Sequence, residues 1–172
     1  MFVSWNMTKA CNLRCKHCYR DAGEREEHEL NTIEGKHLLF ELKESGCSRI
    51  IFSGGEALLR DDIYELIDYA NSLGIRCVLG SNGMLIDLHT AKRLLDAGIG
   101  RVGISLDSSN PEKHDEFRQC TGAFEQTIAG INACLQAGLD VQIHTTVMDF
   151  NMDELSKLSD MAQRLGAKAH HI

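Results

Sequence analysis

The run CNLRCKHCY, from Cys11 to Tyr19, is the part of this sequence that most restricts its fold and its chemistry. Its three cysteines, Cys11, Cys15 and Cys18, place three thiolates within one short segment. Iron–sulfur clusters are held by cysteine thiolates, and an ordinary electron-transfer cubane takes four of them. A compact set of three therefore leaves one iron open to another ligand, much as catalytic metal sites keep one coordination position open.

Three other interpretations of these cysteines compete with a cluster. Spacings of four and three also place side chains on one face of a helix, but the intervening residues are polar and no apolar stripe continues the pattern. Zinc, with His17 or Cys47 as the fourth ligand, lacks the second pair of ligands that structural zinc sites usually have. Disulfides would leave one of the seven cysteines unpaired, and nothing at the start reads as a secretory signal. We therefore expect a reducing, cytoplasmic location.

Composition favours one globular domain over a nucleic-acid-binding or membrane protein. The chain has 172 residues, of which 43% are hydrophobic, enough for a sizeable core. A net charge of -7 and the dispersal of its 18 Lys and Arg residues disfavour a nucleic-acid surface. No uninterrupted apolar stretch is long enough to span a bilayer. We expect neither nucleic acid nor a membrane as a partner.

Helical segments recur along the chain, each closed by a glycine where a left-handed residue would end a helix. These glycines are Gly46, Gly74, Gly98, Gly138 and Gly166. Asn31 followed by Glu34 resembles a capping box, and Pro111 suits the first turn of a helix. The pattern predicts five helices.

Short apolar strands alternate with these helices. The predicted strands are Phe2–Met7, Arg49–Ser53, Ile75–Leu79, Arg101–Leu106 and Leu139–Val147. Such alternation predicts an α/β fold with a parallel sheet, curled into either a barrel or a doubly wound sheet. Polar residues follow the strands, as in βα barrels whose site lies at the strands' carboxyl ends. Because residues 167–172 look like the start of a sixth strand, we expect a partial (β/α)6 TIM-like barrel, truncated near that strand.

Four motifs in order carry a family resemblance. They are the three cysteines after the first strand, Ser53-Gly54-Gly55-Glu56 after the second, Ser81-Asn82-Gly83 after the third, and Ser105-Leu106-Asp107 after the fourth. Together they resemble the radical S-adenosylmethionine (SAM) superfamily over essentially the whole chain. From the resemblance we expect residues 1–172 to be the N-terminal portion of a radical SAM core domain, without the C-terminal extension.

The resemblance implies an enzyme. Cys11, Cys15 and Cys18 would hold a [4Fe–4S] cluster, and the methionine part of SAM would chelate the fourth iron. Electron transfer from a flavodoxin- or ferredoxin-like donor would then cleave SAM, and the resulting 5'-deoxyadenosyl radical would take hydrogen from a substrate. The cofactor would supply the chemistry, while the protein would supply position and exclusion of water.

The resemblance also implies a set of SAM contacts. Gly54 and Gly55 would let the backbone approach the ligand, and Glu56 would offer a carboxylate to the methionine amine. The family usually has proline next, where this chain has Ala57. His17 takes the place of an aromatic residue near the adenine.

The third and fourth strands would contribute further contacts. Ser81 and Asn82 end the third strand, where the Asn82 amide can donate and accept hydrogen bonds. Ser105 and Asp107 suit ribose hydroxyls or the methionine moiety, although Asp107 could equally cap a turn or helix.

A charged residue and two weaker candidates complete the set. Arg118 matches, allowing one residue of slippage, the family's arginine for the SAM carboxylate, although it could be an ordinary surface arginine. His144 and Thr146 are weaker candidates for lining the cavity. The four remaining cysteines are expected to be structural.

Within the superfamily, the segments 4–8, 19–23 and 51–56 most resemble the SPASM-type, tetrapyrrole-modifying branch. That branch acts in the alternative, siroheme-dependent haem pathway and on the haem cofactor of nitrite reductase. Similar sequences mature peptides or metal cofactors, so a small-molecule or peptide substrate is expected. The non-enzymatic alternative is an iron–sulfur or zinc-binding module.

Overall fold

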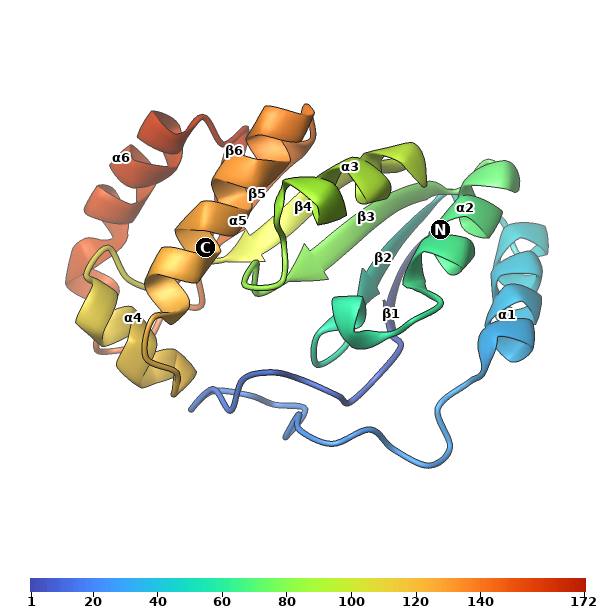
Figure 1. Cartoon of the computed structure of the whole chain (residues 1–172), viewed down its shortest axis with the longest axis horizontal. Helices are drawn as coiled ribbons and strands as arrows, with labels where there is room; N and C mark the ends of the chain where they lie inside the picture. The colour runs from blue at the N-terminus through green and yellow to red at the C-terminus, as the bar shows by residue number, and fades with distance from the viewer.

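The computed structural model describes residues 1–172 as strands and helices in regular alternation (Figure 1). In chain order the elements are β1 (Phe2–Asn6), α1 (Thr32–Glu44), β2 (Arg49–Ser53), the 3-10 turn η1 (Ala57–Leu59), α2 (Ile63–Ser72), β3 (Arg76–Ser81), α3 (Leu88–Asp96), β4 (Ile99–Ser105), α4 (Pro111–Arg118), α5 (Ala123–Ala137), β5 (Asp140–His144), the 3-10 turn η2 (Met152–Glu154), α6 (Leu155–Leu165) and β6 (Ala169–His171).

The six strands form one parallel sheet in the order β1-β2-β3-β4-β5-β6. A doubly wound sheet would reverse its strand order at a switch point, whereas this order is sequential throughout. The predicted partial TIM-like barrel is therefore confirmed, as an open sheet whose first and last strands are not paired with each other. The helices lie along the outer side of the curved sheet in Figure 1. We call the opposite side the inner face.

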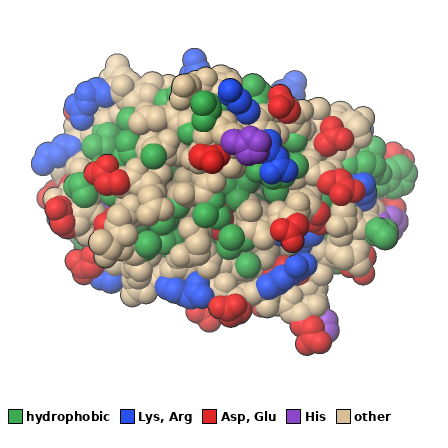
Figure 2. Space-filling view, viewed as in Figure 1, with side chains coloured by type: hydrophobic (Ala, Val, Ile, Leu, Met, Phe, Trp, Pro, Cys, Tyr) green, Lys and Arg blue, Asp and Glu red, His purple; other side chains and the backbone are tan.

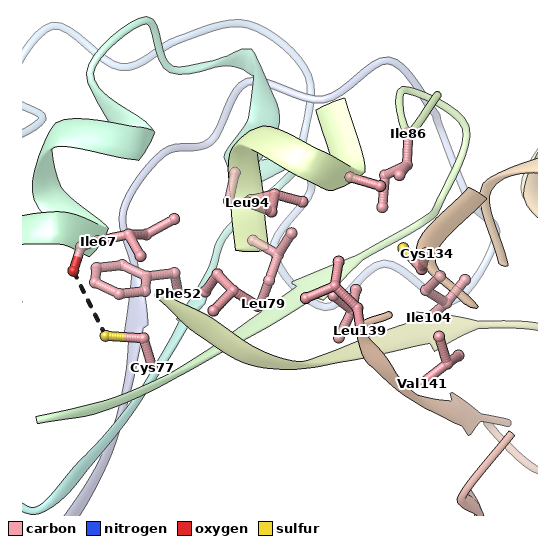
Figure 3. Close-up of a cluster of buried hydrophobic side chains, with 14 of the residues drawn as sticks. Phe52, Ile67, Cys77, Leu79, Ile86, Leu94, Ile104, Cys134, Leu139 and Val141 are labelled. Carbon is pink, nitrogen blue, oxygen red and sulfur yellow. Dashed lines mark hydrogen bonds between the residues drawn. The ribbon is translucent and has the colours of Figure 1, made fainter. Parts of the chain in front are cut away.

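The hydrophobic core lies between the sheet and these helices. Alternation along β2 is clear, because Ile50 and Phe52 are fully buried while Ile51 between them faces the other side of the sheet. Figure 3 shows Phe52 beside Ile67 of α2 and Leu79 of β3, with the Cys77 thiol donating to the Ile67 carbonyl at 3.7 Å. The thiol of Cys77 has its pKa raised to about 12 by burial, which keeps it protonated in the core.

The predicted helix boundaries are confirmed where a local signal exists. All five predicted glycines have positive φ angles, between +73° and +100°, at or just after a helix end. Asn31 and Glu34 form the expected capping box, and Pro111 occupies the first turn of α4.

Two predictions of element boundaries were wrong. The structure has six α-helices and not five, because Gln119 adopts a left-handed φ of 54° and separates α4 from α5 without a glycine. The predicted strand 139–147 ends at His144. After His144 the chain no longer continues as a strand, because the Thr146 amide donates to the Asp107 carboxylate and not to a neighbouring strand.

None of the helices combines the length and the apolar character needed to cross a lipid bilayer. On the face shown in Figure 2, acidic and basic side chains are interspersed.

Candidate functional site

The three predicted cluster cysteines lie on a loop that crosses the carboxyl ends of the strands (Figure 1, blue). We call residues 8–23 the cysteine loop. Its two ends are joined, because the Cys11 amide donates to the Gly23 carbonyl at 3.0 Å and the Gly23 amide donates to the Lys9 carbonyl at 2.9 Å. Its far side reaches α4, where the Lys16 amide donates to the Phe117 carbonyl at 3.0 Å.

Gly54 and Gly55 hold the cysteine loop against the end of β2. The Gly55 amide donates to the Thr8 carbonyl at 2.7 Å, and the next amide donates to the Ala10 carbonyl at 2.7 Å. A Cβ atom would lie 2.4 Å from the Thr8 oxygen at Gly54, whose φ is +152°, and 2.3 Å from the Ala10 oxygen at Gly55. The close approach that requires glycine here is therefore to the cysteine loop.

One cavity of about 450 Å³ collects most of the predicted site residues. All of them line it except Glu56 and Asp107. The predicted residues in its wall are Cys11, Cys15, Cys18, His17, Gly54, Gly55, Ser81, Asn82, Ser105 and Arg118, joined by the weaker candidates His144 and Thr146.

The Glu56 carboxylate lies behind the cavity wall. It is fully buried and accepts hydrogen bonds from the Ser81 hydroxyl at 3.0 Å, the Asn82 amide at 2.9 Å and the Leu58 amide at 3.3 Å. Burial raises the pKa of this carboxyl, and the three donors counteract that effect. Its hydrogen bonds tie the end of β3 to the loop after β2.

Asp107 is also buried behind the wall, where it orients Arg118. Its carboxylate accepts from Arg118 Nε at 2.7 Å, pairs with Arg118 Nη2, and accepts from the Thr146 amide at 3.0 Å. Arg118 is itself buried and brings Nη1 to 3.7 Å from the Cys15 sulfur. The guanidinium therefore faces the cavity from a fixed position.

The three thiols fit a cluster better than a single metal ion. No three His, Cys, Asp or Glu side chains converge as ligands of one ion, yet all three sulfurs belong to one cavity. A cubane takes each cysteine on a different iron, so it suits separated sulfurs. Burial raises the pKa of the Cys11 and Cys15 thiols, and the Arg118 charge opposes this at Cys15. Metal binding would deprotonate them.

Two of the alternatives, zinc completed by Cys47 and a set of disulfides, do not fit this geometry. Cys47 lies just before β2, at the other end of the strands, and its thiol donates to the Arg49 carbonyl at 3.2 Å. It cannot complete a zinc site with the cysteine loop. All seven cysteines are free thiols, so the disulfide interpretation does not hold.

Two polar atoms in the cavity wall are buried without a partner. They are Nδ1 of His17 and Nε of Arg20. Buried polar groups are nearly always hydrogen-bonded, so this pair marks room for a polar ligand. The His17 ring stacks on Phe117 with 4.4 Å between centroids and 5° between planes. Burial and the nearby Arg118 charge lower the His17 pKa.

Two site residues escaped the sequence analysis. Asn12 accepts a hydrogen bond from Asn82 Nδ2 at 2.8 Å and so links the cysteine loop to the end of β3. Arg20 lines the cavity two residues after the last cysteine. Only their position beside the cysteines could have drawn attention to them.

Comparison with known proteins finds relatives in both fold and sequence. At the level of fold, the structure of Streptococcus suis SuiB bound to S-adenosylmethionine has a TM-score of 0.82 at 18% identity, covering 98% of this chain and 39% of that one. An AdoMet-dependent heme synthase of Oleidesulfovibrio alaskensis is 45% identical over 99% of this chain and 44% of its own length. A pre-heme d1 synthase of Dinoroseobacter shibae is 33% identical over 99% of this chain and 42% of its own.

The chain thus spans less than half the length of these relatives. A family model described as the radical SAM superfamily matches residues 5–162, which include the cysteine loop and the whole of strands β2 to β5. With that match, and with the three cysteines in one cavity beside the ends of the strands, the chain belongs to the radical SAM superfamily.

Proposed function

We propose that this chain binds a [4Fe–4S] cluster through Cys11, Cys15 and Cys18 and cleaves SAM reductively at it. The observation that carries the proposal is the single cavity where these three thiols meet Arg118 and the unpartnered nitrogens of His17 and Arg20. Thiols suit iron, and the charged and unpaired groups suit a polar ligand beside it.

When bound, the reduced cluster would supply one electron to the SAM sulfonium, giving methionine and a 5'-deoxyadenosyl radical that takes a hydrogen atom from the substrate. The chain's own residues would position SAM. Arg118, oriented by Asp107, is suited to bidentate pairing with the methionine carboxylate. The stacked His17 and Phe117 rings offer an aromatic surface for the adenine. The Ser105 hydroxyl in the wall suits the ribose.

The substrate we propose is a porphyrin-type tetrapyrrole whose side chains are modified. The relatives named heme synthase and pre-heme d1 synthase support this class, because each matches 99% of this chain. A low-potential donor of the flavodoxin or ferredoxin type would supply the electron. The free state of all seven cysteines is consistent with a reducing, cytoplasmic setting.

The decisive assay measures SAM cleavage. The chain is reconstituted anaerobically with iron and sulfide, reduced with dithionite and given SAM, and 5'-deoxyadenosine and methionine are quantified. Cys15→Ala removes one cluster thiolate, while Cys120→Ala removes a thiol outside the cavity and serves as the matched control. We expect both products from the unmodified chain and from Cys120→Ala. Cleavage no faster than that of Cys15→Ala would refute the proposal.

A further inference from the structure

A second cavity, of about 580 Å³, lies on the inner face toward the amino ends of the strands. Ile51 and His144 line both this cavity and the one that holds the cysteines. The two cavities therefore adjoin each other, with these two side chains between them. Figure 1 shows the helices on the other side of the sheet, and most of the lining of this cavity comes from the strands, with Asn71 of α2 and Gly98 at its rim.

Three arginines form the floor of this space. Arg49 and Arg76 are register partners on β2 and β3, and Arg101 on β4 is paired with Val78, the next inward position above Arg76. We call these three residues the arginine row. Adjacent strands lie about 4.8 Å apart, so the three side chains start from neighbouring positions on one face of the sheet.

The arginine row is short of counter-charges. The guanidinium groups of Arg49 and Arg76 make no hydrogen bond or ion pair within the chain. Arg101 has one carboxylate partner, Asp140 at 3.4 Å, and both side chains of that pair are 41% exposed. Like charges directly opposite each other on paired strands are destabilising. The three arginines lie on neighbouring strands although the chain as a whole has a net charge of -7. Arrangements of residues that cost stability in this way are typical of binding sites.

The residues that line the space above the arginine row are first apolar and then small or polar. Ile51 and Val78 form an apolar middle layer. Nearer the cysteines the inward positions on β2, β3 and β4 are small, namely Ser53, Gly80, Gly103 and Ser105, and the His144 ring of β5 lies over Gly103. From Arg49 to Ser53 the strand rises about 13 Å. A ligand that fits this space would have an apolar body about 13 Å long and several carboxylates at one edge. Its opposite edge would point toward the cysteines.

We propose that the arginine row binds the carboxylate side chains of a tetrapyrrole substrate and so fixes the macrocycle on the inner face, below the cysteine cavity. This inference rests on the proposed function for its choice of substrate. Arginine suits the task because its planar guanidinium pairs with a carboxylate through two parallel hydrogen bonds. The flat macrocycle would lie against Ile51 and Val78.

Binding of coproporphyrin III, a tetrapyrrole with four propionate groups, tests the proposal. The cluster-free chain is titrated with it and the dissociation constant is read from porphyrin fluorescence. The variant carries Arg49→Gln and Arg76→Gln together, and Arg164→Gln at the exposed end of α6 is the matched control. We expect the double variant to bind at least about tenfold more weakly and the control to bind like the unmodified chain. Equal affinity of double variant and unmodified chain, or no binding by the unmodified chain, overturns the proposal.

Two further measurements distinguish tetrapyrrole binding by the arginine row from a structural role of these arginines and from simple charge attraction. Because the substitutions relieve repulsion, the melting temperature of the double variant should stay equal or rise, and a fall of several degrees would make the row structural. Tetraglutamate carries comparable charge without a macrocycle and should bind much more weakly. If it matches coproporphyrin III, the tetrapyrrole assignment is wrong. None of these assays needs cluster or SAM, so their failure is distinct from absent SAM cleavage.

Discussion

Arg118 Nε donates to the buried carboxylate of Asp107 at 2.7 Å, and this bond joins the last residue of α4 to the loop after β4. The same carboxylate accepts from the Thr146 amide after β5. On its other side the guanidinium reaches the Cys15 sulfur at 3.7 Å. Asp107 therefore acts on the cysteine cavity through Arg118, as a positioning residue.

Asp107→Asn should loosen this arrangement without removing a cavity residue. Asparagine keeps the shape of the side chain but leaves the buried Arg118 charge without its partner, so we expect the free energy of unfolding to fall by about 3 kcal/mol. SAM should bind about tenfold more weakly, while cluster iron per chain stays unchanged. Urea unfolding and calorimetric SAM titration measure the two effects, with the exposed Asp149→Asn as control. Unchanged SAM affinity would show that Asp107 does not orient Arg118 for SAM.

Glu56→Gln should destabilise the chain even without cluster or SAM. The Glu56 carboxylate accepts hydrogen bonds from Ser81 and Asn82, and a carboxamide offers only one acceptor oxygen to those donors. We expect a loss of about 2 kcal/mol in the free energy of unfolding. Urea titration of the cluster-free chain measures it, and the exposed Glu44→Gln is the control. A variant as stable as the unmodified chain would mean that these bonds do not hold the loops together.

Gly55→Ala should displace the cysteine loop. The added Cβ would meet the Ala10 oxygen at 2.3 Å, and both partners are backbone, so the loop must move. We expect iron incorporation on anaerobic reconstitution to fall to less than about a tenth, because the Cys11, Cys15 and Cys18 sulfurs lose their common setting. Gly100→Ala is the matched control, since nothing lies within 4 Å of a Cβ there. Full iron content in Gly55→Ala would contradict the close packing seen here.

Glu154→Gln should change how stability depends on pH. Burial tends to raise the pKa of Glu154, but donors from Lys113, Ser108 and Ser109 outweigh it and lower the pKa to about 2 from an ordinary 4.5. A carboxylate with a depressed folded-state pKa contributes stability that is present above the unfolded pKa and lost as pH falls through the folded pKa.

The stability difference between the unmodified chain and Glu154→Gln should therefore be about 2 kcal/mol at pH 7 and shrink steadily between pH 4.5 and pH 2. Urea unfolding at several pH values measures this, with the exposed Glu27→Gln as control. A difference that does not vary with pH would contradict the ionised hydrogen-bonded role of Glu154.

The sequence predicted the order of the elements because strong local signals mark their ends. Five glycines, a capping box and Pro111 each act within one turn of a helix. The break between α4 and α5 was missed because a left-handed Gln119 has no signature of its own. Its conformation is held by contacts such as Asp115 accepting from the Phe124 amide at 2.8 Å.

The sequence predicted which residues form the candidate site but not the role of each residue in it. The motif positions after each strand had to meet, since parallel strands end at one edge of the sheet. Which carboxylates face the cavity depends on pairings distant in sequence, such as Asp107 with Arg118 and Glu56 with Ser81. The arginine row was invisible for the same reason, because only strand register brings Arg49 beside Arg76.

The electron paramagnetic resonance spectrum of the reduced, anaerobically reconstituted chain, recorded with and without SAM, tests the central claim most directly. If Cys11, Cys15 and Cys18 hold a [4Fe–4S] cluster with one open iron, a cubane signal appears and shifts when SAM is added, and Cys15→Ala abolishes both the signal and the shift. A cubane signal that is the same with and without SAM, or one that persists in Cys15→Ala, would contradict the account.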